Sequence, residues 1–307
     1  MTVSRFSAIS LCVAAAFSCT ANPAPLAKAA QVPVKVPVKP PVAPVVKAPP
    51  ANAVRTDFWL RNNAVQGGIV LGQVPTGAAS LSLNGTPVPL ENDGYFLIGF
   101  DRDAENSASL VATLANGKTV ERYLPVRPGN WKIEHVKANP TGGAATTAEF
   151  NARRGPELAQ INAARTIKSN SQGWRQDFIW PLKGRISGVF GSQRIYNGSP
   201  GSYHSGLDIA MPTGTTYVAP ADGVVVLAAK QPFTLEGYLL IVDHGMGLSS
   251  AFLHSSELLV AKGDVVKQGQ AIGKVGATGR TSGPHLHWGM KWNAARTDPL
   301  LRVPTVN

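Results

Sequence analysis

The chain has 307 residues, of which 29 are Lys or Arg and 18 are Asp or Glu, so its formal net charge is +11. A hydrophobic content of 44% excludes a wholly disordered chain, and two cysteines exclude a disulfide scaffold or a cysteine-rich zinc module. The length suggests two domains at roughly 150 residues each. The 31 glycines and 24 prolines, with only 7% aromatic residues, favour β structure rich in turns.

The excess positive charge is spread along the chain and does not mark one folded surface. Residues 1–50 contain five basic residues and no acidic one, residues 51–145 are balanced, and residues 174–307 have a net charge of +4. A nucleic-acid-binding protein would concentrate its positive charge on one folded face. The charge pattern therefore argues against a nucleic-acid partner.

The N-terminus has the layout of a secretory signal peptide, which we place at residues 1–29. Arg5 precedes an apolar stretch of 12 residues (6–17), which is too short to span a bilayer. Small residues suited to cleavage follow at Ala27-Lys28-Ala29 and, earlier, at Cys19-Thr20-Ala21. We therefore expect an exported protein of the periplasm or cell envelope, with no transmembrane segment in the mature chain.

Cys19 offers an alternative route of processing. The residues before it, Ala16-Phe17-Ser18, resemble a lipoprotein box that departs from the usual pattern. Lipidation at Cys19 would anchor the protein to a membrane. Cleavage at either small-residue site would instead remove both cysteines, so that stability in an oxidising compartment would rest on the core and not on disulfides.

Residues 30–52 form a linker rich in Pro, Val and Lys, which we expect to be an extended polyproline II spacer. Residues 53–137 then show short apolar runs at a spacing near ten residues, typical of an all-β sandwich. Hairpin turns are predicted at three dipeptides: Asn84-Gly85, Asp93-Gly94 and Asn116-Gly117. The single histidine of this region, His135, is interpreted as a surface residue.

Residues 138–173 are predicted to be a helical linker. Thr146 and Glu149 have the spacing of a capping box, and Pro156 suits the first turn of a helix. Because Gly155-Pro156 interrupts the pattern, we expect one or two short helices that connect the two domains.

Residues 174–307 again indicate short β-strands. Apolar runs rich in β-forming residues occupy 223–229, 237–242 and 248–254, and glycines separate the remaining segments. Five of the six histidines lie in this region. His244, in the sequence Val-Asp-His-Gly, is interpreted as a structural residue of a turn.

Four of these histidines occur in patterns that a metal site would use. His204 and Asp208 are four residues apart, so their side chains share a face of either a strand or a helix. His285 and His287 alternate with Leu286 and Trp288, which predicts a strand with an apolar core face and both histidines on the opposite face. His254 ends the third apolar run.

Zinc chemistry explains why such groups would come together. A catalytic zinc ion takes three protein ligands and keeps one position for water, whose pKa it lowers to about 7. A nearby imidazole can transfer the proton or bind the developing oxyanion. The spacing alone does not decide which histidine of the 285–287 pair would bind the metal. Satisfied surface histidines on a β domain are the alternative interpretation.

Three segments together resemble the lysostaphin-type, LytM-like zinc peptidases that cut peptidoglycan. They are residues 184–225 (GRISGVFGSQR to YVAPADGVV), 250–256 (SAFLHSS) and 263–290 (GDVVKQGQAIGKVGATGRTSGPHLHWGM), and the resemblance extends over about 178–301. It implies a small antiparallel β-sheet fold with a narrow groove. It implies three zinc ligands, which are His204, Asp208 and His287. It also implies two catalytic imidazoles, those of His254 and His285.

The resemblance leads to a predicted function with two rivals. We expect residues 174–307 to be a zinc metalloendopeptidase that hydrolyses peptide stems or cross-links of peptidoglycan. Some relatives have lost zinc ligands and act as envelope adaptors that activate murein amidases; no ligand is lost here. An enzyme held latent by its own N-terminal domain or linker is the third hypothesis.

Overall fold

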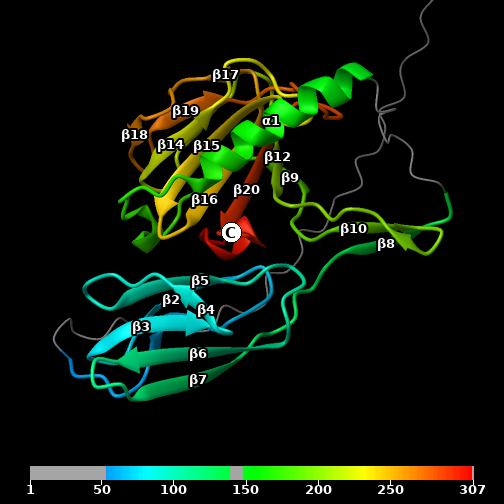
Figure 1. Ribbon diagram of the computed structural model, residues 1–307. Coiled ribbons are helices and arrows are strands. Elements are labelled where there is room, and N and C mark those ends of the chain that lie inside the picture. The colour runs from blue at the N-terminus through cyan, green and yellow to red at the C-terminus, as the bar shows by residue number, and fades with distance from the viewer. Residues whose placement is uncertain (1–52, 139–147, 306–307) are drawn as a thin grey trace, which may run out of the picture. The chain divides into compact units, whose positions relative to one another are not determined.

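The computed structural model describes residues 53–138 and 148–305, which are nearly all β with one α-helix (Figure 1). This confirms the all-β prediction. The predicted signal peptide, the Pro/Lys-rich linker, Cys19 and the capping residue Thr146 lie outside the described residues. Within the described ranges, no helix combines the length and apolar character needed to cross a membrane.

Residues 59–125 form two antiparallel sheets that share one core. The first sheet, in the order β1-β2-β5, consists of β1 (Trp59–Leu60), β2 (Ile69–Gln73) and β5 (Tyr95–Gly99). The second, in the order β4-β3-β6-β7, consists of β3 (Ala78–Leu83), β4 (Thr86–Val88), β6 (Ser107–Leu114) and β7 (Thr119–Pro125). Val70 and Phe96 of the first sheet are buried in the same cluster as Leu81 and Leu110 of the second. This arrangement is the predicted sandwich.

The predicted hairpin turns differ in their backbone conformation. Asn84 and Gly85, between β3 and β4, both have positive φ angles of 48° and 78°, as a type I′ turn requires. In the β6–β7 turn only Gly117 has a positive φ, because the Asn116 side chain accepts a hydrogen bond from the backbone N–H of Lys118. Gly94 likewise takes the positive φ, of 78°, in the turn before β5.

The C-terminal part is built on one large and one small sheet. The strands of the large sheet, in spatial order, are β18 (Val265–Val266), β14 (Gly223–Ala228), β15 (Tyr238–Gly245), β16 (Leu248–Ser255), β20 (Leu286–Trp292), β12 (Leu207–Ala210) and β9 (Arg185–Gly188), with β21 (Ala295–Thr297) paired to β20. The small sheet orders β13 (Thr216–Val218), β19 (Ala271–Lys274) and β17 (Glu257–Leu258). Two short 3-10 helices, η1 (Gly173–Arg175) and η2 (Pro299–Leu301), also belong to this part.

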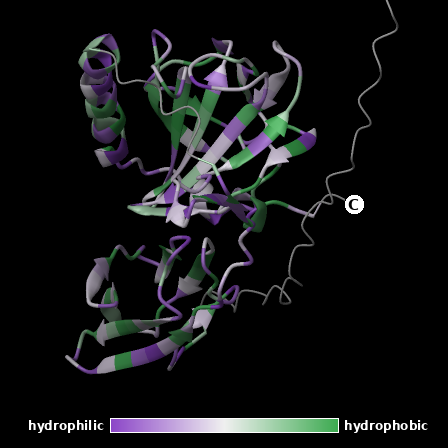
Figure 2. Cartoon of the chain, turned by 90° about the vertical axis from the view of Figure 1, so that its right-hand side faces the viewer, coloured by the Kyte–Doolittle hydropathy of each residue, from purple (hydrophilic) through white to green (hydrophobic). Residues whose placement is uncertain are grey.

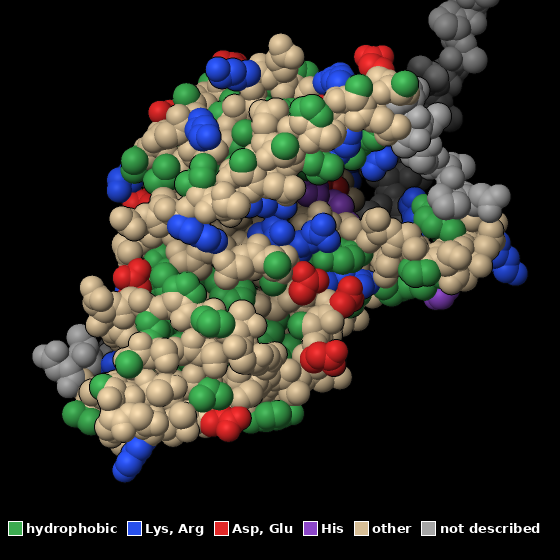
Figure 3. Space-filling view, viewed as in Figure 1, with side chains coloured by type: hydrophobic (Ala, Val, Ile, Leu, Met, Phe, Trp, Pro, Cys, Tyr) green, Lys and Arg blue, Asp and Glu red, His purple; other side chains and the backbone are tan. Residues whose placement is uncertain are grey.

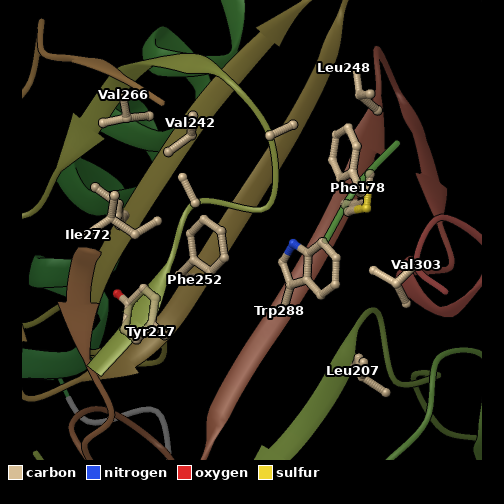
Figure 4. Close-up of a cluster of buried hydrophobic side chains, with 14 of the residues drawn as sticks. Phe178, Leu207, Tyr217, Val242, Leu248, Phe252, Val266, Ile272, Trp288 and Val303 are labelled. Carbon is tan, nitrogen blue, oxygen red and sulfur yellow. The ribbon is translucent and has the colours of Figure 1, made fainter. Parts of the chain in front are cut away.

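A stack of aromatic rings joins these two sheets (Figure 4). Phe252 of β16 stacks on Tyr217 of β13, with ring centroids 5.4 Å apart, and lies parallel to Trp288 of β20 at 6.5 Å. All three side chains are fully buried. Because successive strand residues face opposite sides, burial of Leu286 and Trp288 turns His285 and His287 away from this core.

The one helix of the described residues, α1 (Ala148–Thr166), agrees with the first of the two predicted alternatives, but it is longer than expected and lacks the interruption at Gly155-Pro156. It continues through Pro156, where the missing backbone N–H costs one helical hydrogen bond. Contacts on both sides of the proline hold the helix together: Arg154 and Glu157 bind the loop before β15, and Ile161 packs against the large sheet. Hydrophobic and hydrophilic residues alternate along the helix, consistent with one packed side (Figure 2).

A third, mixed sheet was not predicted from the sequence. Strand β8 (Ile133–Val136) pairs in parallel with β10 (Gln193–Tyr196), and β10 pairs with β11 (Ser199–Pro200). His135 lies on β8 and is exposed, as expected of a surface histidine. The loop that carries His204 begins directly after β11, so this sheet lies next to the candidate site in the chain.

Candidate metal centre

A cleft on the C-terminal part contains the predicted site residues. Its volume is about 360 Å³, and histidine side chains are visible inside a recess of the surface in Figure 3. The cleft is lined by His204, Ser205, Asp208, Leu235, Glu236, Leu253, His254, Arg280, Thr281, Ser282, His285 and His287. It therefore brings together all five residues that the sequence singled out for metal binding and catalysis.

Two neighbouring strands and one loop supply the three candidate metal ligands. Asp208 of β12 lies directly opposite His287 of β20 in the antiparallel register, and their Oδ1 and Nδ1 atoms are 2.8 Å apart. His204, in the loop before β12, places Nε2 at 3.1 Å from Asp208 Oδ2 and 3.2 Å from His287 Nδ1. Sheet pairing thus joins residues that are about 80 positions apart in the chain.

The spacing of these three side chains, whose ligand atoms lie within 4.8 Å of one another, suits a small tetrahedral metal ion. Zinc binds imidazole nitrogen at 2.0–2.1 Å and carboxylate oxygen at similar lengths, so neighbouring ligand atoms around it lie roughly 3.3 Å apart. The imidazole nitrogens of His204 and His287 are 3.2 Å apart, and each lies within 3.1 Å of one oxygen of the Asp208 carboxylate, Oδ2 and Oδ1 respectively, so small side-chain adjustments reach that value. Two imidazoles and one carboxylate are also a donor set that zinc accepts.

The shifted pKa values of Asp208 and His287 favour a bound cation, whereas that of His204 favours a proton on the ring, which a metal ion would have to displace. Burial alone would raise the pKa of Asp208, but hydrogen bonds and charges from His204 and His287 outweigh it and lower the pKa below its ordinary value. Burial lowers the pKa of His287, and its hydrogen bond to Asp208 only partly opposes this. For His204, burial also acts to lower the pKa, but the contact with Asp208 prevails and raises it.

Backbone carbonyls fix the orientation of three imidazoles. The Nδ1–H groups of His204, His254 and His285 donate to the carbonyl oxygens of residues 189, 278 and 283, at 3.1, 2.9 and 2.9 Å. Each neutral ring then carries its lone pair on Nε2. In His204 this is the nitrogen next to Asp208, and in His254 and His285 it is the nitrogen left for chemistry.

The two candidate catalytic histidines lie beside the ligand set. The rings of His254 and His285 have centroids 5.0 Å apart, and His285 Nε2 is 3.5 Å from Asp208 Oδ1. Burial lowers the pKa of His254, which favours its neutral form. A neutral imidazole with a free Nε2 can accept a proton or hydrogen-bond a substrate oxygen.

His244 does not belong to this cleft. It lies within strand β15 and not in the expected turn. Its ring is enclosed by the core and lies edge-on to Phe178, with the two ring centroids 4.9 Å apart. Its Nδ1–H donates to the carbonyl oxygen of Asp222, and its Nε2 accepts from the Ser250 hydroxyl, each at 2.8 Å. Both ring nitrogens are thus satisfied inside the protein.

Sequence reasoning missed two glycines that make room for the ligands. A Cβ atom on Gly188 would lie 2.4 Å from Asp208 Oδ2, and one on Gly206 would lie 2.6 Å from His287 Nε2. Neither glycine has a positive φ, so a close approach and not a turn explains them. The position of Gly206 between the two predicted ligands His204 and Asp208 was the one feature of the sequence that could have indicated this role.

Two charged residues of the cleft were also missed. Glu236 lies on the loop before β15 and is paired with Arg154, whereas Arg280 is exposed in the segment between β19 and β20. No spacing in the sequence relates them to the histidines, because tertiary folding alone brings these loops to the cleft.

An all-β fold with two imidazoles and a carboxylate in one cleft is the arrangement expected of a β-sheet metallopeptidase domain. Residues 202–299 match the model of peptidase family M23, so the chain contains a domain of this metallopeptidase family. The matched range includes all five predicted site residues. The roles of these residues remain predictions.

The relatives carry two kinds of name. The chain is 41% identical over 107 residues to the peptidoglycan DD-endopeptidase ShyA of Vibrio cholerae. This match covers 34% of this chain and 24% of ShyA. It is 32% identical over 211 residues to the murein hydrolase activator NlpD of Salmonella dublin, and this match covers 66% of this chain and 49% of NlpD. The chain thus spans less than half the length of either relative.

One solved structure shares most of the fold. A crystal structure of a Pseudomonas aeruginosa protein assigned to peptidase M23 superposes with a TM-score of 0.59 at 29% identity. The match covers 78% of this chain and 95% of that chain. The common fold therefore extends beyond the family domain itself.

Proposed function

We propose that this protein is an exported zinc-dependent endopeptidase that hydrolyses peptide bonds in the stems or cross-links of peptidoglycan. The observation that carries the proposal is the convergence of His204, Asp208 and His287, whose ligand atoms lie within 4.8 Å of one another, beside two imidazoles with oriented rings. The name of ShyA supports the substrate class. Export to the periplasm or cell envelope rests on the N-terminal signal pattern.

Each residue has a part in the proposed reaction. His204, Asp208 and His287 would hold the zinc ion, which lowers the pKa of a bound water and polarises the scissile carbonyl. His254 Nε2 would accept a proton during attack and return it to the leaving amine. His285 Nε2 would donate a hydrogen bond to the developing oxyanion when this ring is protonated.

The charges of the cleft support an acidic peptide as substrate. Glu236 is neutralised by its two bonds to Arg154, at 2.6 and 2.8 Å. Arg280, in contrast, is exposed at the cleft and would attract a carboxylate of a peptide stem. Peptide cross-links that contain meso-diaminopimelate offer such carboxylates.

The second candidate function is a catalytically silent envelope adaptor that activates a murein amidase. It is favoured by the long match to NlpD, which includes residues outside the family domain. Against it stands the complete set of ligand side chains, because an adaptor has no need of three metal ligands and two oriented imidazoles.

Digestion of purified sacculi by the zinc-loaded protein separates the two candidates. We expect peptide products that mass spectrometry of the soluble fragments identifies, and none with the Asp208→Ala variant. An adaptor would release nothing alone and would increase the activity of an added amidase, with the variant as effective as the parent. Digestion by the variant at the parental rate would contradict the proposed enzyme.

A further inference from the structure

The loop between β14 and β15 (residues 229–237) connects the cleft to the rest of the sheet. Its residues Leu235 and Glu236 line the cleft. The carbonyl oxygen of Glu236 accepts the backbone N–H of His254 at 2.8 Å, and that of Leu235 accepts the N–H of Arg280 at 3.0 Å. The loop therefore holds the backbone of a predicted catalytic residue directly.

His254 depends on this support because of its backbone conformation. Its φ angle is +64°, in the left-handed region that residues other than glycine rarely adopt. Such a conformation persists only where the surroundings fix it, and it sets the direction in which the side chain leaves the strand. The contacts that hold it include the bond from the His254 N–H to Glu236, the bond from the Thr278 N–H to the His254 carbonyl at 3.4 Å, and the bond from the ring to the Thr278 carbonyl.

Helix α1 binds the same loop through charged side chains. The guanidinium of Arg154 makes two hydrogen bonds to the Glu236 carboxylate, at 2.6 and 2.8 Å. The carboxylate of Glu157 accepts the N–H of Thr234 at 2.8 Å and its hydroxyl at 2.5 Å. Glu157 is only 5% exposed, so these bonds are shielded from water.

These bonds are more than the helix needs to attach to the sheet. Ile161 and Ala164 already bury an apolar side of α1 against Val226 and Ile241. Buried charged groups cost solvation energy and add little to stability compared with apolar packing. What they do supply is a defined geometry, because a bidentate Arg–carboxylate pair has few orientations.

We propose that Arg154 and Glu157 are positioning residues of the active-site cleft, which act through the 229–237 loop on His254. The helix fixes the loop, the Glu236 carbonyl fixes the His254 backbone, and that backbone aims the imidazole at the metal centre. The catalytic part of this inference rests on the proposed endopeptidase function. The mechanical part, from the helix to the His254 amide, stands on the contacts alone.

The test compares full-length variants with two kinds of readout. Arg154→Ala removes the pair, and Arg154→Lys keeps the charge with one bond. Asn162→Ala is the control, an exposed residue of the same helix with no hydrogen bond to the loop among the described residues. We measure kcat and KM on cross-linked muropeptides, bound zinc, and the hydrogen-exchange rate of the His254 amide by NMR.

For Arg154→Ala we expect kcat to fall about tenfold to a hundredfold, because a small misplacement of a catalytic group has that effect. KM should change less than about threefold and zinc should stay bound, since the ligands are not touched. Exchange at the His254 amide should become at least about tenfold faster. Arg154→Lys should recover part of each change, and Asn162→Ala should match the parent.

Each contrary outcome has a distinct meaning. If Arg154→Ala keeps the parental kcat and the parental His254 exchange rate, the inference is overturned. It is also overturned if activity, zinc content and melting temperature all fall together, because that result indicates a merely structural role. A zinc-loaded parent that cuts no muropeptide would refute the proposed function, and His254 exchange would still decide the mechanical part. Should Arg154→Ala not fold, Glu236→Gln breaks the same pair from the loop side.

Discussion

The large sheet holds buried histidines in two different settings, at His244 and in the cleft. His244 and the ligand His287 are both nearly inaccessible, with exposed fractions of 0% and 8%. In His244 both ring nitrogens have partners outside the cleft, whereas in His204, His254 and His285 a carbonyl holds Nδ1 and Nε2 faces the cleft, where Asp208 and His287 are the partners of His204. Burial therefore does not separate a structural from a functional histidine; the partner of the second nitrogen does.

Removal of a ligand should have the largest effect on turnover. Asp208→Ala takes away the carboxylate between His204 and His287, so zinc binding should be lost and activity should fall by at least roughly a thousandfold. Metal analysis after dialysis and a sacculus digestion assay measure the two effects. Parental zinc content in this variant would remove Asp208 from the ligand set.

Removal of a catalytic imidazole should separate chemistry from metal binding. His254→Ala and His285→Ala should keep about one zinc per chain but lose roughly 10²–10⁴-fold in kcat, the usual contribution of a general acid or base. His135→Ala, an exposed histidine on β8, serves as the control. Loss of zinc in either cleft variant would instead class that histidine as a ligand.

Crowding of the ligands should have an intermediate effect. In Gly188→Ala the new methyl group meets Asp208 Oδ2 at 2.4 Å, so the carboxylate must move. We expect metal affinity to fall about 10–100-fold, as for other changes to the surroundings of metal ligands. Competition with a chelator measures it, and Gly155→Ala, where a Cβ meets no atom within 4 Å, is the control. Equal affinities would contradict the tight packing at β9.

His244 should affect stability and not turnover. Burial lowers its pKa from 6.5 to about 4, so between these values the unfolded chain binds a proton that the folded protein excludes. The free energy of unfolding should thus be unaffected by this group above pH 6.5 and decrease as the pH falls to 4, by roughly 3 kcal/mol in total.

The His244→Asn variant tests this linkage. Its unfolding free energy, measured by urea titration between pH 7 and pH 4, should lose most of the decrease, while kcat at neutral pH stays within about twofold of the parent. His135→Asn should keep the parental pH dependence, because this side chain is exposed. A His244→Asn protein with impaired turnover and normal stability would place His244 in the functional group after all.

The sequence by itself determined the local structure and the types of residue in the site. Alternation in residues 285–288 predicted a strand with two histidines on one face, and the structure has β20 with Trp288 in the core. The resemblance to a peptidase family, now matched over residues 202–299, supplied the five site residues. Such features can be predicted because the period of a strand and the order of motifs are local properties.

Only the tertiary structure decided which distant groups meet. The continuous α1, the bonds from Arg154 and Glu157 to the cleft loop, and the space that Gly188 leaves for Asp208 depend on segments that are far apart in the chain. The break expected at Pro156 was wrong for the same reason, since contacts on both sides of the proline outweigh its local preference. Propensity and spacing describe neighbours in sequence, and the geometry of the cleft is set by neighbours in space.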